Sequence, residues 1–84
     1  MKFSVLALDY DGTIAGANGV SPAVRQAIAT VRAQGVVVIL VTGRILKDLR
    51  RVAGDLHFVD AVVGENGAAI EFPASGYGEA LAAP

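Results

Sequence analysis

Short, mostly apolar runs alternate along this chain with segments in which apolar residues recur every three or four positions. The runs Phe3–Leu8, Val36–Thr42 and Phe58–Val63 are partly β-branched and end at polar or turn-forming residues. Runs of this length and composition are typical of buried strands. We therefore expect three strands, with a loop over Thr13–Val20, where glycine and asparagine interrupt the pattern.

A helix is expected between each pair of successive strands. Ser21 is a favourable N-cap, Pro22 suits the first helical position, and Gly35 ends the segment. The apolar positions of this helix follow one amphipathic stripe: Val24, Ala27, Ile28 and Val31. The second helix has a similar stripe and ends at Gly54: Ile45, Leu49, Val52 and Ala53.

This order of elements, joined by short loops, predicts an α/β fold with a parallel βαβαβ sheet and right-handed crossovers. The turn residues Asn66 and Gly67 predict that Ala68–Phe72 pairs back beside the third strand. If consecutive strands are neighbours, both helices cover the same face of the sheet. Val36–Val41 is nevertheless apolar at every position, as in strands covered on both faces. We therefore expect further sequence or a partner chain to cover the second face.

Composition supports a small domain with an apolar surface that needs cover. The chain has 84 residues, of which 54% are hydrophobic, more than the roughly 45–50% of an ordinary soluble domain. A net charge of −1 provides no electrostatic basis for binding nucleic acid or an anionic membrane. Cysteine is absent, and neither a signal peptide nor a membrane-spanning segment is visible. A cytoplasmic location is therefore predicted.

Candidate chemistry lies where the first two strands end. Asp9 and Asp11 follow the first apolar run and enter a turn at Gly12, and Thr42 and Gly43 end the second run. The carboxyl ends of adjacent parallel strands are where open α/β sheets bind ligands. Paired carboxylates provide a nucleophile and oxygen ligands for Mg²⁺, which suits phosphoryl transfer.

The motifs at these two strand ends resemble those of a known family. Asp9-Tyr10-Asp11-Gly12-Thr13 resembles the first motif of haloacid dehalogenase-like phosphatases, and Val41-Thr42-Gly43-Arg44 resembles their second. Gly64-Glu65-Asn66-Gly67-Ala68 is similar to a segment of members whose cap domain follows the second motif, such as Cof-type and phosphoglycolate-phosphatase-like proteins. The resemblance implies a partial, Rossmann-like three-layer fold. Residues 1–73 then form the N-terminal portion of a catalytic core, and residues 74–84 form a loose tail or the start of a missing cap insertion.

The resemblance also implies roles for individual residues. Asp9 attacks phosphorus and becomes an aspartyl-phosphate, and Asp11 acts as the general acid and base. Mg²⁺ takes oxygen ligands from the Asp9 carboxylate and the Asp11 backbone carbonyl. The Thr42 hydroxyl and the Gly43 N–H bind the phosphoryl group, and Gly12 allows the backbone to approach it closely. The implied substrate is a small phosphorylated metabolite.

Other polar residues allow two interpretations. Arg44 either clamps an anionic substrate or is a solvated arginine at a helix start. Asn66 either forms only a hairpin turn or also contacts substrate. Three cations on the second helix are expected to form its solvated face: Lys47, Arg50 and Arg51. His57 has no partner at metal-ligand spacing and is interpreted as structural.

The family's third and fourth motifs, which supply a lysine and further metal-binding acids, have no counterpart here. We therefore expect the isolated chain to be a poor or inactive phosphatase, with substrate specificity residing mostly in a cap. A phosphomutase is a close variant. The alternative from another class is a non-catalytic module or remnant that binds phosphate or metal and docks through its bare sheet face. A receiver domain fits poorly, because its acceptor aspartate would follow the third strand, where Val63-Gly64-Glu65 stands.

Overall fold

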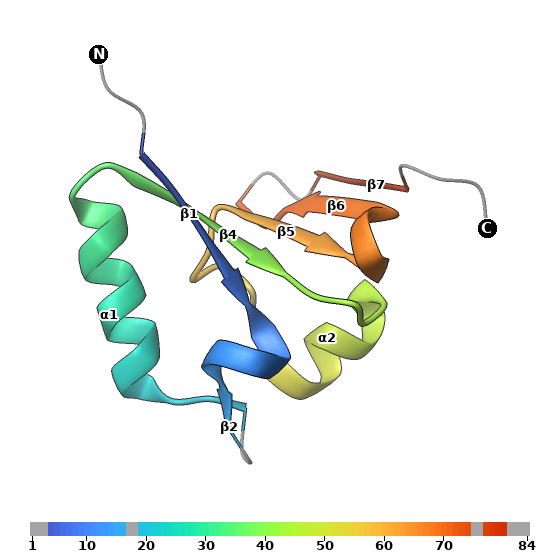
Figure 1. Ribbon diagram of the computed structural model, residues 1–84, viewed down its shortest axis with the longest axis horizontal. Helices are drawn as coiled ribbons and strands as arrows, with labels where there is room; N and C mark the ends of the chain where they lie inside the picture. The colour runs from blue at the N-terminus through green and yellow to red at the C-terminus, as the bar shows by residue number, and fades with distance from the viewer. Residues whose placement is uncertain (1–3, 17–18, 75–76, 81–84) are drawn as a thin grey trace.

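The computed structural model describes residues 4–16, 19–74 and 77–80. These residues contain a five-stranded sheet in the order β1-β4-β5-β6-β7, which runs across Figure 1 from left to right. The strands are β1 Ser4–Asp9, β4 Val36–Val41, β5 Ala61–Gly64, β6 Ala69–Phe72 and β7 Tyr77–Ala80. The first three are parallel, and β6 and β7 are antiparallel to their neighbours. The predicted α/β fold and its returning hairpin strand are confirmed.

Two helices connect the parallel strands. Helix α1 spans Pro22–Ala33 and α2 spans Leu46–Ala53. The Ser21 hydroxyl accepts a hydrogen bond from the Val24 N–H at 3.2 Å, as expected of an N-cap. Gly35 has a φ of +87°, a conformation that favours glycine and turns the chain from α1 into β4. No helix among the described residues is long and apolar enough to cross a membrane.

Both helices pack on one face of the sheet, as the strand order requires. The core joins Ile28 of α1 and Leu49 of α2 to the inward side chains of β4 and β5, and four of its members are fully inaccessible: Val38, Leu40, Leu49 and Val62. On the opposite face, Val5, Val37 and Val41 are 60%, 37% and 38% exposed. The predicted bare apolar face is therefore present, and what covers it stays a prediction.

Asp60 joins three elements just before β5. Its carboxylate accepts a hydrogen bond from the Val38 N–H at 2.8 Å and one from Arg32 of α1 at 2.9 Å, while its own N–H donates to the Val38 carbonyl. Burial opposes the charged form of Asp60, but these two hydrogen bonds outweigh burial and lower the pKa of the carboxyl below its ordinary value.

The third strand is shorter than the apolar run predicts. We expected it over Phe58–Val63, but β5 begins at Ala61. Val59 donates its N–H to the Leu56 carbonyl, which forms a turn, and Phe58 packs beneath the Arg25 guanidinium at 4.5 Å from its ring centroid. These residues are apolar because they fill the space between α1 and the sheet, and not because they belong to a strand.

Two segments outside the main elements contain more structure than the sequence indicated. The predicted loop over Thr13–Val20 includes the end of a π-helical turn, η1 (Tyr10–Ile14), and the short paired strands β2 (Ala15–Gly16) and β3 (Gly19–Val20). Within residues 74–84, where a loose tail or the start of an insertion was expected, β7 pairs with β6. Residues 75–76 and 81–84 lie outside the described part of the chain.

Candidate functional site

The ends of β1 and β4 lie side by side in the sheet. The two strands pair in parallel over their whole length, with Asp9 opposite Val41, so η1 and Thr42 leave the sheet at the same edge. The Thr42 side chain is buried, whereas Asp9 and Asp11 are exposed to solvent. The register therefore brings the predicted nucleophile, acid and phosphate-binding hydroxyl to one edge, as the motif positions indicated.

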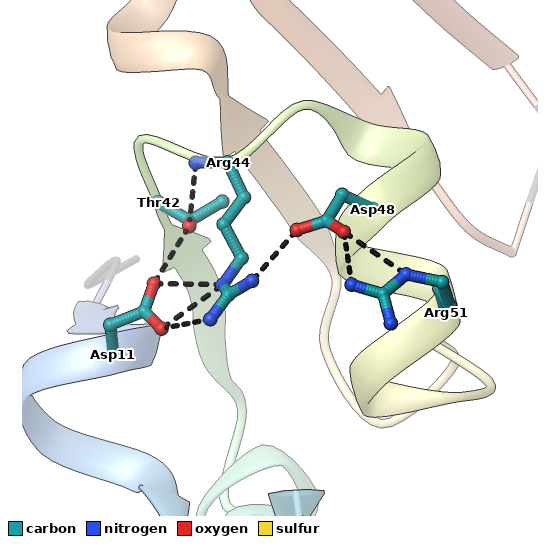
Figure 2. Close-up of polar contacts among 5 residues, drawn as sticks. All are labelled: Asp11, Thr42, Arg44, Asp48 and Arg51. Atoms are coloured by element: carbon teal, nitrogen blue, oxygen red, sulfur yellow. Dashed lines mark hydrogen bonds and ion pairs between the residues drawn. The ribbon is translucent and has the colours of Figure 1, made fainter.

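Arg44 binds directly to Asp11. Its Nε donates to both carboxylate oxygens of Asp11, at 3.0 and 3.1 Å, and its Nη2 donates to Oδ1 at 2.8 Å (Figure 2). The Thr42 hydroxyl lies 3.5 Å from Oδ2 of the same carboxylate and accepts the Arg44 backbone N–H at 3.1 Å. Arg44 is therefore ion-paired as well as partly solvated, and the clamping of an anionic substrate by it stays a prediction.

A second carboxylate holds the other end of the same guanidinium. Nη1 of Arg44 donates to Asp48 at 2.7 Å, four residues further on, and Arg51 donates to the opposite oxygen of Asp48 at 2.6 and 3.1 Å (Figure 2). The pKa of Arg44 is raised above its ordinary value. The hydrogen bond to Asp11 contributes most to this shift, and the hydrogen bond to Asp48 contributes next. Hydrogen bonds from Arg51 and then from Arg44 lower the pKa of Asp48 below its ordinary value.

The expected solvated face of α2 is confirmed, because Lys47, Arg50 and Arg51 are all exposed, and two of these cations also form ion pairs at the surface. Arg51 pairs with Asp48, and Arg50 forms an ion pair with Glu71 of β6. Asp48 was not predicted as a site residue, although its spacing from Arg44 is that of neighbours on one helical surface. That spacing was the available signal. Arg44 lies before α2, which begins at Leu46, so the four-residue spacing alone does not predict that Arg44 and Asp48 are in contact.

Asn66 reaches the same edge from the loop after β5. Its N–H donates to the Thr42 carbonyl at 3.4 Å, and the Glu65 N–H donates to the Arg44 carbonyl at 2.9 Å. Asn66 Oδ1 lies 2.9 Å from where a Cβ on Gly43 would stand, so glycine at this position admits the amide. Asn66 is therefore both part of the predicted turn and adjacent to the predicted phosphate-binding residues.

Gly12 lies against the predicted nucleophile. A Cβ at this position would overlap Oδ2 of Asp9. The absence of a side chain thus leaves room for the Asp9 carboxylate over the η1 turn. Packing against Asp9 therefore requires glycine at position 12, independently of the predicted contact with phosphate.

Other polar clusters lie away from these residues. His57 contacts Asp55 in the segment after α2, and hydrogen bonds from the His57 side chain and backbone lower the pKa of Asp55. A cavity of about 380 Å³ beside this pair is lined by residues of α2, the following segment and β6. The interpretation of His57 as structural stays a prediction.

Known proteins resemble this chain in sequence and in fold. Residues 6–78 match the sequence profile of haloacid dehalogenase-like hydrolases. A solved phosphatase of the haloalkanoate (HAD) enzyme superfamily from Bacteroides thetaiotaomicron superposes with a TM-score of 0.69 at 30% sequence identity. The match covers 86% of this chain and 27% of that one, so this chain spans just over a quarter of that phosphatase. The profile match, over most of the chain, establishes that the chain belongs to the haloacid dehalogenase-like hydrolases.

Proposed function

We propose that this chain carries the nucleophile and the phosphate-binding part of a Mg²⁺-dependent phosphatase. Its substrate is a small phosphorylated metabolite, and its intermediate is an aspartyl-phosphate. The observation that carries the proposal is the meeting of Asp9, Asp11 and Thr42 at one sheet edge. Family membership and the related HAD phosphatase support the same chemistry.

The proposed reaction has two steps, transfer of the phosphoryl group to Asp9 and hydrolysis of the resulting aspartyl-phosphate. A carboxylate oxygen of Asp9 forms a bond to phosphorus while the bond from phosphorus to the departing alcohol oxygen breaks, and protonated Asp11 gives its proton to that oxygen. Water then attacks phosphorus and loses a proton to Asp11, and the bond between Asp9 and phosphorus breaks. The products are the alcohol, inorganic phosphate and unmodified Asp9.

The exposed carboxylate of Asp9 and the backbone carbonyl of Asp11 are the groups proposed to hold Mg²⁺. Both are hard oxygen donors, and Mg²⁺ is commonly bound in proteins through one or two carboxylates with its remaining positions filled by water and substrate phosphate. When bound, the ion neutralises negative charge on the phosphoryl group. The described residues contain no cluster of three or more acidic or histidine side chains suited to a metal. We therefore expect weak metal binding and slow turnover by this chain alone.

Labelling of Asp9 tests the proposal without requiring rapid turnover. The wild-type chain is incubated with Mg²⁺ and p-nitrophenyl phosphate, quenched in acid and examined by mass spectrometry for one added phosphoryl group on Asp9. We expect hydroxylamine to remove the label, because acyl phosphates react with it. The control Asp9→Asn keeps the shape of the side chain but lacks the nucleophile and should remain unlabelled. Equal labelling of both proteins, or none in the wild type at any pH, would contradict the proposed intermediate.

The second candidate is a non-catalytic module that docks through its bare sheet face. The exposure of Val5, Val37 and Val41 favours it, since large apolar patches mark interaction surfaces. Absence of labelling together with phosphate binding that depends on Thr42 would favour this module over the enzyme.

A further inference from the structure

The two side-chain donors expected to bind a phosphoryl group are both directed at Asp11 in this structure. The Thr42 hydroxyl faces Oδ2 at 3.5 Å, and two nitrogens of Arg44 contact the same carboxylate. A carboxylate and a phosphoryl group present similar pairs of oxygens to a guanidinium, which binds either one through two parallel hydrogen bonds. Asp11 thus occupies, for these donors, the place of an anionic ligand.

We infer that Asp11 is an internal anion for Arg44, and that a phosphate monoester binds by taking over the Nε and Nη2 edge of this guanidinium while Asp48 keeps the guanidinium in place. The inference rests on the proposed function and adds two elements to it. Arg44 becomes a ligand-binding residue that changes partners. Asp48 becomes a positioning residue that acts through Arg44.

The contacts divide the guanidinium into an exchangeable edge and an anchored end. The edge formed by Nε and Nη2 faces Asp11, while Nη1 is held by Asp48, which Arg51 holds in turn. The guanidinium also lies 5.9 Å from the centroid of the buried Tyr10 ring. Because the anchor and the ring are separate from the exchangeable edge, Asp11 can leave without releasing Arg44 from the site.

Because the ion pair of Asp11 and Arg44 is partly exposed, the exchange of partners costs little free energy. The side chains of Asp11 and Arg44 are 49% and 34% exposed, so water can solvate either one while partners change. Ion pairs of this exposure contribute little to stability. Exchange also frees the Asp11 carboxylate from the three hydrogen bonds that Arg44 donates to it. Ligand binding would therefore release the group that the proposed reaction needs.

The opposing explanation is that the ion pair is a static tie between η1 and α2. The two explanations predict different affinities for inorganic phosphate, measured by calorimetric titration of the full 84-residue chain in metal-free buffer. Under our inference, Asp11→Asn weakens the competitor and tightens phosphate binding about five-fold, since hydrogen bonds to a charged partner are about twice as strong as neutral ones. In an Arg44→Gln background the same substitution should change the affinity less than about two-fold.

Three further variants separate partner exchange from general electrostatics. Asp9→Asn removes the same charge from the same edge, so its effect on phosphate affinity should persist when Arg44 is replaced by glutamine. Asp48→Asn should weaken phosphate binding about three-fold, within the range of exposed ion pairs, although removal of a negative charge alone predicts tighter binding. The control Asp55→Asn, which lies beyond the end of α2, should leave the affinity unchanged.

A second readout follows the Arg44 side chain itself. In ¹H–¹⁵N spectra, the Nε–H signal of Arg44 should shift in Asp11→Asn and Asp48→Asn. Saturating phosphate should then bring this signal in Asp11→Asn and in the wild type to similar positions, because the same anion occupies the exchangeable edge in both. Phosphate binding that depends on Thr42, with an Asp11→Asn effect that is the same with and without Arg44, would overturn the inference and leave the proposed function intact. No phosphate binding in any variant would overturn both.

Discussion

Replacement of Thr42 by valine separates the structural and functional roles of the one polar side chain in the described core. Thr42 is 3% exposed, and its hydroxyl accepts the backbone N–H of Arg44 at 3.1 Å. Valine has nearly the same shape, so it creates no cavity but removes this acceptor. Loss of a hydrogen bond to a buried group costs about 1–3 kcal/mol. We expect about 1 kcal/mol here, because Arg44 lies near the surface and water can replace the hydroxyl.

The functional consequence of the same substitution should be larger. If Thr42 donates to a phosphoryl oxygen, its loss removes a hydrogen bond to a charged group, which is typically worth about 1.5–3 kcal/mol. Phosphate affinity should therefore fall about ten-fold or more, while the melting temperature falls by roughly 4–8 °C. Thr42→Ser keeps the hydroxyl and should retain most of the phosphate affinity.

The assay combines thermal unfolding followed by circular dichroism with calorimetric titration of inorganic phosphate. Loss of stability without loss of phosphate affinity in Thr42→Val would show that the hydroxyl serves only the Arg44 N–H. Loss of affinity in Thr42→Ser with none in Thr42→Val would show that side-chain shape, and not hydrogen bonding, controls the site. Either result would refute the assignment of Thr42 to phosphate.

Two further predictions follow from contacts outside this hydroxyl. The carboxyl of Asp60 has a lowered pKa, so its contribution to stability should be present above the unfolded pKa of about 3.9 and be lost progressively as the pH falls from there through the lower pKa of the folded state. Asp60→Asn should cost about 1 kcal/mol at pH 7 and less at pH 3, measured by urea unfolding; an equal cost at both pH values would contradict this. Gly12→Ala should displace the Asp9 carboxylate and reduce Asp9 labelling about 100-fold with little change in stability, whereas undiminished labelling would show that the close approach is unimportant.

Much of the site could be predicted because its members stand at the ends of strands. Asp9, Asp11 and Thr42 follow apolar runs directly, and parallel pairing must then place them at one edge. The place of Asn66 in the site could not be predicted in this way, because a turn sequence accounts only for the local conformation of the chain. Its position beside Gly43 depends on hydrogen bonds between two loops that are more than twenty residues apart in sequence.

The partner of each charge could not be read from the chain. Arg44 has acids at several separations, and its choice of both Asp11 and Asp48 follows from the path of η1 and the starting point of α2. Similarly, Phe58 looked like a strand residue, because periodicity does not distinguish an apolar turn packed under Arg25 from a short buried strand.

The amino-acid sequence by itself determined the alternation of the three parallel strands with the two helices, the N-cap of α1, the all-apolar β4 and the presence of two acids at the end of β1. These features depend on local backbone preferences and on the burial of apolar side chains, which act over a few residues. Only the tertiary structure decided that the Asp11 carboxylate faces Arg44 and Thr42, and that Asp48 holds the far end of the same guanidinium. Such pairings depend on distances of a few ångströms between segments that the sheet brings together, and hydrophobic pattern carries no information at that scale.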